Sequence, residues 1–211
     1  MVIGGYIAND QRWQAYLGAW QQAMESYRVK AFHMAECASG LGPYARWGHL
    51  KCQARAAYLV RNILNKHLAA SFAVGLRKAV YNTVCADLEN EMIGGVYTLA
   101  TLACMKLAKD WALKRGYTEP ISYTLEAGGS GSAEVFRTVE FLAAHPELRK
   151  RYLVHELVSR DKISAPQLQA ADLVVHQVNR AFRRVSPLPR DRVSVVDWLQ
   201  KKPHFWKTLR A

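Results

Sequence analysis

Apolar residues recur at helical spacing along several segments of the chain. After residue 8, Trp13, Leu17, Trp20, Met24 and Tyr27 follow one another at intervals of three or four, which places them in one stripe on a helix. The same periodicity, with Gly or Pro near several segment ends, predicts further helices over about residues 48–67, 96–115, 133–145 and 167–184.

Other segments alternate between apolar and polar residues, as half-buried strands do. In the segment 121–126, Ile121, Tyr123 and Leu125 share one face, and polar residues occupy the other. Alternation of this kind, or a short run of β-forming residues, predicts strands over residues 1–8, 71–78, 121–126 and 152–158.

The order of these segments predicts the fold class. Strands that alternate with helices are typical of an α/β protein in which helices cover a sheet. The longest apolar stretch lies within residues 94–107 and is shorter than the roughly 20 residues of a membrane span, so a membrane function is not expected. A Ser-Pro-Leu-Pro linker at 186–189 separates a C-terminal appendage, residues 186–211, with a small helix over about 193–201.

The charge of the chain points to a polyanionic partner. Lys and Arg number 29 against 17 Asp and Glu, which gives a net charge of +12. Such a balance favours nucleic-acid binding. Residues 180–211 hold nine basic and two acidic residues, a net charge of +7, and a solvated tail is the alternative interpretation. The nucleic-acid-binding candidates are Arg180, Arg183, Arg184, Lys201 and Lys202.

The cysteines and the N-terminus predict the compartment. Cys37, Cys52, Cys85 and Cys104 show no paired spacing, so we expect four free thiols in a reducing environment. The apolar first residues have no basic segment before them and do not resemble a signal peptide. The sequence therefore predicts a cytoplasmic protein.

Asp172 is the first candidate for chemistry. It lies on the flank of an apolar helical stripe that includes Leu168 and Val175. A carboxylate in that position must be paired, protonated or bound to a cation, because burial of a bare charge is costly. The alternative is a structural carboxylate that caps or pairs with a neighbour. His176, one turn later, is placed to join Asp172 or to face water.

Glu126 is the second candidate, because it ends an alternating strand just before a glycine-rich turn. Functional groups of α/β sheets collect at the carboxyl ends of strands, although a solvated glutamate is the simpler interpretation. His33 and Glu36 are three residues apart and are weak evidence for a metal site. The sequence contains no phosphate-binding GxxxxGK[ST] loop, dinucleotide GxGxxG motif, GxSxG elbow or HExxH motif.

Several motifs together resemble a known family. They are GGYIA before a Trp-containing helix, FHMAECASGLGP, a strand that ends in Leu125-Glu126, Asp161-Lys162, and PQLQAADLVVHQ. This series, which extends to about Arg184, resembles the family called domain of unknown function 3800, which is similar to the ribonuclease H fold. The resemblance implies a mixed sheet flanked by helices, with a helical insertion between Asn9 and about His67.

The resemblance also implies roles for individual residues. Glu126 and Asp172 would belong to a carboxylate set that holds Mg²⁺ or Mn²⁺, an oxygen-rich site of the kind these cations prefer. Lys162 would contact phosphate, and His33 and Glu36 would support the site or contact substrate. His176, one turn after Asp172, is a further candidate to support the site. Carboxylates from separate elements that converge on metal ions are the basis of two-metal phosphoryl chemistry.

The sequence departs from the family at its start. Family members open with an acidic strand before the GGYIA strand, whereas Met1 here begins inside the second strand. We therefore expect a domain over residues 1–185 that lacks the first strand and its leading aspartate. The edge of residues 1–8 would then be open, and it would favour a homodimer.

These observations predict a divalent-metal-dependent nuclease or phosphodiesterase that acts on nucleic acid and is either active or degenerate. Glu126 and Asp172 would hold the cation, and Lys162 would contact phosphate. The first alternative is a non-catalytic nucleic-acid-binding protein that uses its basic C-terminal region. The second alternative is a protein-interaction module of a mobile element or defence system.

Overall fold

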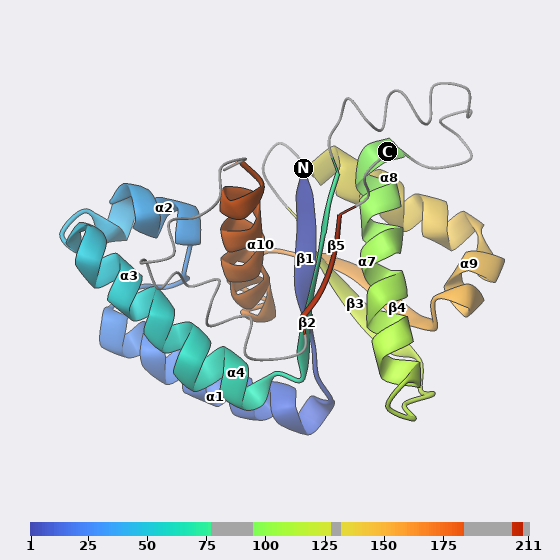
Figure 1. The fold of residues 1–211 in the computed structure, drawn as a ribbon, viewed down its shortest axis with the longest axis horizontal. Helices are drawn as coiled ribbons and strands as arrows, with labels where there is room; N and C mark the ends of the chain where they lie inside the picture. Colours follow the sequence, from blue (N-terminus) through green and yellow to red (C-terminus); the bar gives the residue numbers. More distant parts are fainter. Residues whose placement is uncertain (77–94, 128–131, 184–203, 209–211) are drawn as a thin grey trace. The chain divides into compact units, whose positions relative to one another are not determined.

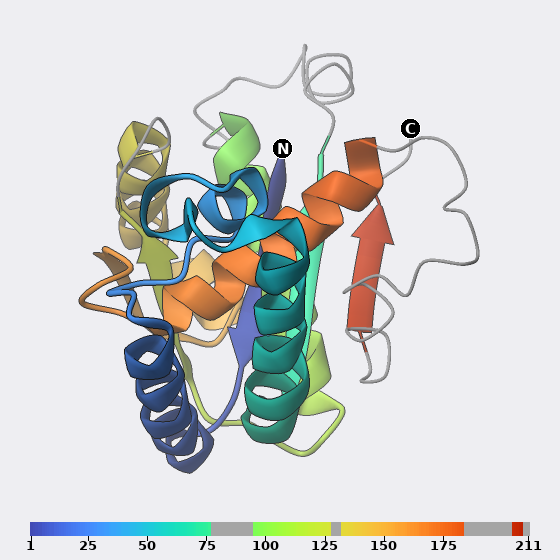
Figure 2. The same ribbon diagram turned by 90° about the vertical axis from the view of Figure 1, so that its left-hand side faces the viewer.

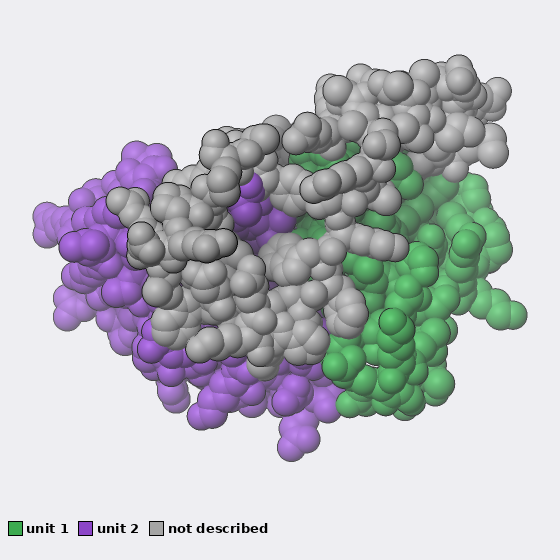
Figure 3. Space-filling view, viewed as in Figure 1, with its two compact units in different colours: residues 1–3, 72–164, 206–211 green, residues 4–71, 165–205 purple. Residues whose placement is uncertain are grey.

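The structure, a computed structural model, describes residues 1–76, 95–127, 132–183 and 204–208. Helices and strands alternate along these residues, which confirms an α/β protein (Figures 1 and 2). The predicted linker at 186–189 and the predicted helix at 193–201 lie outside the described residues. The chain forms two units, and each is described by itself (Figure 3). Unit 1 comprises residues 1–3, 72–164 and 206–211, and unit 2 comprises residues 4–71 and 165–205.

Three strands form the first sheet in the order β1-β2-β5. Their bounds are Val2–Ile7, Ala70–Gly75 and His204–Thr208. Met1 and Leu76 exchange two backbone hydrogen bonds of 2.8 and 2.9 Å, and Ala69 N–H donates to the carbonyl of Ile7 at 3.0 Å, so β1 and β2 are antiparallel. The predicted strands at 1–8 and 71–78 are thus confirmed for their described residues.

The central strand β2 differs from its predicted pattern. All six of its residues are buried, although the sequence alternates in polarity. A strand that is covered on both faces buries both sets of side chains. The small residues Ser71, Ala73 and Gly75 occupy the face opposite Phe72 and Val74, where alternation alone predicts exposure to solvent.

Two parallel strands form the second sheet, which lies in unit 1. They are β3 (Ile121–Glu126) and β4 (Val154–Arg160). Burial along β3 alternates as predicted from the sequence, and β4 begins and ends two residues later than predicted. The described strands form two sheets and not the single mixed sheet that the resemblance implies, because no backbone ladder joins β1 or β2 to β3 or β4.

Helices connect and cover the strands of unit 1. They are α7 (Gly95–Leu113), α8 (Ser132–Ala144) and α9 (Pro146–Arg151). Two of them, α8 and α9, supply the crossover that parallel strands require. α8 packs against α7 and both strands. The helix α9 was not predicted, since Pro146 ends one helix and also occupies the first turn of the next.

The core of unit 1 includes Val74, Leu76 and Ala100, and Leu99 and Leu107 pack against it. Both leucines lie on α7 and are partly buried. The fully buried residues of α7 are Thr98, Ala100, Thr101, Met105, Ala108, Trp111 and Ala112. No helix among the described residues is long and apolar enough to cross a membrane.

Unit 2 is built from helices. Their bounds are α1 Asp10–Tyr27, α2 Met34–Ser39, η1 Gly42–Tyr44, α3 Gly48–Tyr58, η2 Leu59–Leu64, α4 Asn65–His67 and α10 Gln167–Arg183. Of these, η1 is a 3-10 helix and η2 is a π-helix. Three of them, α3, η2 and α4, follow one another without a break, which confirms the helix predicted over residues 48–67 and the helical character of the insertion. They lie beside α1 (Figures 1 and 2).

The packing of α1 shows why its stripe was predictable. Trp20 and Met24 of the predicted stripe are buried, and Tyr16 and Ala23 extend the buried face. Asn9 caps the helix, because its side chain accepts a hydrogen bond of 3.0 Å from the Arg12 N–H. The apolar stripe and the cap are both local signals, so the sequence alone located this helix.

The prediction of four free thiols is wrong for two of the cysteines. Cys37 of α2 and Cys52 of α3 form a buried disulfide, with Cα atoms 5.8 Å apart. The chain reverses through Gly40 and Gly42, which both have positive φ, and α2 therefore packs against α3. Sequence spacing does not reveal that reversal. The thiol of Cys104 is free, and Cys85 lies outside the described residues.

The disulfide predicts a thiol count and a stability change. Titration of the denatured, unreduced protein should detect two thiols, Cys85 and Cys104, and reduction should raise the count to four. Burial raises the pKa of the Cys104 thiol to about 12, so this thiol should react slowly before unfolding. Because the closed loop spans 15 residues, Cys52→Ser should lower the free energy of unfolding by about 3 kcal/mol.

Urea unfolding with and without reductant provides the control. Reductant should destabilise the wild type by a similar amount and should leave Cys52→Ser unchanged. Four thiols in the unreduced protein would show that the bond does not form.

The order of the first sheet leads to a second prediction. Among the described strands, β1 lies at the end of this sheet, and it carries neither Lys nor Pro, the residues that commonly protect an edge. A Cβ at Gly5 would meet no atom within 4 Å. We expect a concentration-dependent homodimer in sedimentation velocity, and Gly5→Lys should shift it toward monomer because the added charge opposes strand pairing. Gly18→Lys on α1, also in open space, is the matched control. A wild type that stays monomeric at high concentration would refute this expectation.

Candidate functional site

The carboxyl ends of β3 and β4 bring Glu126 and Lys162 together in unit 1. The parallel register places Glu126 opposite Arg160, and the Ala127 N–H donates to the carbonyl of Arg160 at 2.7 Å. Since both strands end at the same edge, the residues that follow them share one side of the sheet. This is the edge at which the sequence placed Glu126.

An ion pair occupies this edge. Lys162 Nζ lies 3.1 Å from Glu126 Oε1, and the side chains are 11% and 46% exposed, respectively. Lysine is rarely so buried without a partner. The arrangement places a cation and a carboxylate side by side, with the carboxylate still open to solvent.

A tyrosine hydroxyl belongs to the same region. Burial, with smaller contributions from the charges of Glu126 and Glu134, raises the pKa of Tyr97 on α7 to about 12. Tyr97 therefore remains protonated at neutral pH and can act as a hydrogen-bond donor. Tyr97 is not recognisable as a site residue from the sequence, because its segment shows only the periodicity of a long helix.

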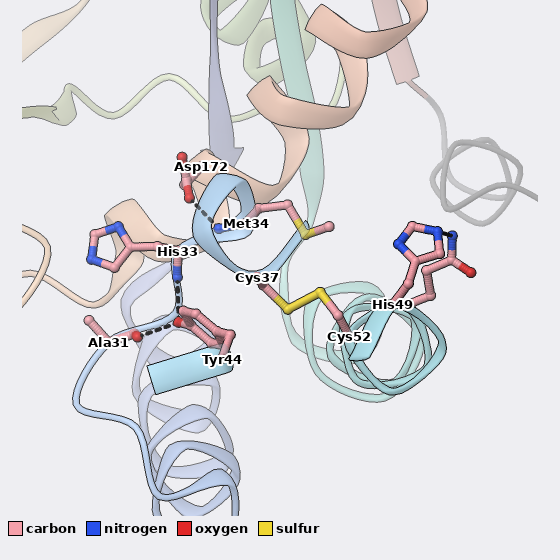
Figure 4. The surroundings of a disulfide bond; sticks show 9 residues. Ala31, His33, Met34, Cys37, Tyr44, His49, Cys52 and Asp172 are labelled. Atoms are coloured by element: carbon pink, nitrogen blue, oxygen red, sulfur yellow. Dashed lines mark hydrogen bonds between the residues drawn. A yellow bond between two sulfur atoms is a disulfide. The ribbon is translucent and has the colours of Figure 1, made fainter. Parts of the chain in front are cut away.

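A second group of polar residues lies in unit 2, around the segment that connects α1 to α2. Gln169 of α10 is 2% exposed, and its Oε1 accepts hydrogen bonds from Trp20 Nε1 at 2.9 Å and from the Phe32 N–H at 2.7 Å. Asp172 Oδ2 accepts the Met34 N–H at 2.9 Å (Figure 4). The FHM motif and the LQAADL motif are therefore in direct contact.

The contact explains why Asp172 lies on the flank of its helix. Met34 is the first residue of α2, and the N-cap residue His33 makes no side-chain capping bond. The first N–H groups of a helix have no acceptor within the helix. Asp172 supplies that acceptor from α10, and its negative charge also interacts favourably with the positive end of the helix dipole. This is the capping role that the sequence analysis kept as an alternative.

Tyr44 completes this group. Its hydroxyl donates to the carbonyl of Ala31 at 2.8 Å and accepts the His33 N–H at 2.9 Å (Figure 4). Burial raises the pKa of Tyr44, the His33 N–H opposes that shift, and the charges of Glu36 and Asp172 reinforce it. Tyr44 and Gln169 thus position the backbone of residues 31–34, and no sequence pattern marks either residue for this role.

The structure separates the predicted site residues into two sets. Glu126 and Lys162 are joined in unit 1, and His33, Glu36 and Asp172 lie around the start of α2 in unit 2. Residue His176 lies one turn beyond Asp172 on α10 and is half-buried. Arg180 and Arg183 belong to the last turns of α10, and Arg184, Lys201 and Lys202 lie outside the described residues.

The described residues do not bring together a complete set of ligands for the predicted metal ion. Within the described ranges, no group of three or more His, Cys, Asp or Glu side chains lies in an arrangement that could hold a metal ion. In unit 1 the predicted ligand Glu126 is paired with the ammonium of Lys162. In unit 2 the predicted ligand Asp172 is already bonded to a backbone N–H.

The contacts of α10 predict a graded loss of stability. Gln169→Ala should cost about 2 kcal/mol or more in urea unfolding, since each buried donor left without an acceptor costs about 1–3 kcal/mol. Asp172→Ala should cost about 1 kcal/mol as a lost cap, and Asp172→Asn should cost less because an amide oxygen still accepts. Gln21→Ala, which removes an exposed hydrogen bond on α1, is the control. A Gln169→Ala variant as stable as that control would show that α10 does not hold the segment.

Comparison with known proteins does not extend this picture. The chain matches no family model, and no curated protein and no solved structure is significantly similar to it. The resemblance to the family called domain of unknown function 3800 therefore stays a prediction from the motifs.

Proposed function

We propose that this protein is a divalent-metal-dependent nuclease or phosphodiesterase that acts on nucleic acid at the carboxyl ends of β3 and β4. The ion pair between Glu126 and Lys162 carries this proposal, because it combines a cation for phosphate and a carboxylate for metal at one edge of a parallel sheet. The net charge of +12 supports a polyanionic substrate. The likeness to ribonuclease H is part of the same proposal.

The chemistry of Glu126 fits one position in the shell of Mg²⁺ or Mn²⁺. Its carboxylate is 46% exposed, and Lys162 contacts one of its two oxygens. Mg²⁺ retains several waters and commonly binds through one or two carboxylates and the phosphates of its substrate, so a full protein cage is not required. Bound at Glu126, such a cation would neutralise charge on the phosphoryl oxygens.

The basic residues at this edge would bind the substrate. The ammonium of Lys162 would leave Glu126 and pair with a phosphate oxygen instead. The exposed Arg160 would contact a neighbouring phosphate. Binding of the anion and of the cation would thus each compensate for separation of the ion pair. Tyr97, protonated at neutral pH, would donate a hydrogen bond near Glu126.

Two different roles are supported for Asp172. The motif resemblance makes it a metal ligand, whereas its bond to the Met34 N–H supports a structural role in unit 2. A variant that keeps the shape and removes the charge separates the two roles, because Asp172→Asn can still accept the Met34 N–H.

Metal binding is tested by calorimetry. Mn²⁺ should raise the melting temperature of the wild type, because a ligand that binds the folded state stabilises it. Glu126→Gln should abolish that rise, and Asp172→Asn should abolish it as well where Asp172 is a metal ligand. Cleavage of labelled DNA and RNA should require Mg²⁺ or Mn²⁺ and should disappear in Glu126→Gln and Lys162→Ala.

Asp110→Asn is the matched control, since Asp110 is an exposed acid that pairs with Lys106 at 2.7 Å on α7. Its metal response should equal that of the wild type. An equal response in Glu126→Gln would remove the reason to call this protein an enzyme, and an unchanged response in Asp172→Asn would assign Asp172 to structure alone.

A second candidate function, nucleic-acid binding without catalysis, is supported by the net charge of +7 in residues 180–211. Salt-dependent binding in EDTA without cleavage would support it, because release of counterions from phosphates makes affinity fall with salt. Lys201→Ala with Lys202→Ala should then weaken binding. Deletion of residues 186–211 is a poorer test, since β5 lies in that appendage and joins the first sheet.

We also propose a cytoplasmic location, as the sequence predicts. The buried disulfide between Cys37 and Cys52 is the observation against it, because disulfides are rare in that compartment. Alkylation of thiols in intact cells, before lysis, would measure the redox state of the two cysteines where the protein resides.

A further inference from the structure

The turn that follows β4 is built by one side chain. Asp161 Oδ1 accepts the N–H groups of Ile163 and Ser164 at 2.8 and 2.9 Å. Ser164 Oγ donates to Asp161 Oδ2 at 2.7 Å and lies 3.2 Å from the carbonyl of Asp161. Aspartate commonly bonds the backbone two or three residues ahead of it in this way. Residues 161–164 therefore form a closed turn.

Lys162 lies inside that turn, and two constraints fix its place. The ladder bond from Ala127 N–H to the Arg160 carbonyl fixes the end of β4 against the residue after Glu126. The Asp161 turn then sets the direction of the chain at the next residue. The outcome is the 3.1 Å approach of Lys162 Nζ to Glu126 Oε1, with the lysine side chain only 11% exposed.

We propose that Asp161, with Ser164, is a positioning residue that aims the Lys162 ammonium at the phosphate-binding edge of β3 and β4. The proposal rests on the proposed function for the identity of the ligand, a phosphate of nucleic acid. It rests on the geometry of the turn for the role of Asp161, which does not itself contact phosphate.

The charge of Asp161 makes this role distinctive. Asp161 is an exposed anion next to a site for a polyanion, so its long-range field opposes binding. The hydrogen bonds of Asp161 offset this unfavourable charge only if binding needs the turn that they close, because that turn positions Lys162. The bonds from the Ser164 N–H, the Ser164 hydroxyl and the Ile163 N–H favour the ionised form and lower the pKa of Asp161.

Two variants separate position from charge. Asp161→Ala removes the charge and the acceptor, whereas Asp161→Asn removes the charge and keeps an amide oxygen for both backbone N–H groups. A charge effect alone predicts tighter nucleic-acid binding in both variants. A positioning role predicts weaker binding in Asp161→Ala and unchanged or tighter binding in Asp161→Asn.

The first measurement needs no nucleic acid. Full-length protein is treated with an amine-acylating reagent, and mass spectrometry follows acylation at Lys162 and at Lys106, whose side chain is 59% exposed. Lys162 should react more slowly than Lys106 in the wild type and in Asp161→Asn, and should lose that protection in Asp161→Ala. Ser164→Ala, which removes one bond of the turn, should lose it in part. Unchanged protection in Asp161→Ala, or equal loss in both Asp161 variants, would overturn the proposal.

The second measurement is the salt dependence of binding to a fluorescent single-stranded DNA and a matching RNA in EDTA. Lys162→Ala should reduce the slope of log K against log salt by about 0.7, the value for one phosphate contact to a single strand. Asp161→Ala should reduce the slope equally, and the double variant should show no further loss. A larger loss in the double variant would show that Asp161 acts independently of Lys162.

Asp110→Ala is the control for the removal of one exposed aspartate, because Asp110 and its partner Lys106 both belong to α7 and not to the turn. It should bind as tightly as the wild type or slightly more tightly. If the wild type binds no nucleic acid, the proposed function fails, and the acylation pattern still decides the role of Asp161.

Discussion

Buried backbone donors in the segment 31–34 impose the constraint on which unit 2 depends. A buried N–H without an acceptor costs about as much as the loss of a hydrogen bond, and this segment has no helix or strand partner to provide one. The acceptors come instead from side chains of Gln169, Asp172 and Tyr44. The start of α2 is therefore fixed by α10, and the position of α2 in turn allows Cys37 to reach Cys52.

The same constraint distinguishes the two acidic residues that the sequence singled out. Asp172 accepts a hydrogen bond from the Met34 N–H, so replacement of Asp172 would leave this donor without its acceptor and lower the stability of the fold, whatever its effect on activity. Glu126 binds no backbone donor among the described residues, and it pairs with an ammonium while nearly half of its side chain remains exposed. Of the two carboxylates, Glu126 is therefore the better suited to exchange its lysine partner for a metal ion or to change its contacts when a substrate binds.

Particular elements show how far local patterns were sufficient. In β3, period-two alternation identified the strand and its exposed face, because one side of the strand remains in solvent. In β2 the same pattern failed to predict burial, because small residues allow both faces to be covered. The helix α9 was missed because Pro146 signals a helix end and a helix start equally well.

The sequence by itself determined the α/β class, most helices and strands, the candidate residues Glu126 and Asp172, and the charge that favours nucleic acid. These properties depend on composition or on neighbours within one or two turns. Tertiary structure decided the roles. The bonds from Phe32 N–H to Gln169 and from Met34 N–H to Asp172 join residues 137 and 138 positions apart. No periodic pattern encodes such a contact, since it arises only when separate elements pack and bury donors that must then find acceptors.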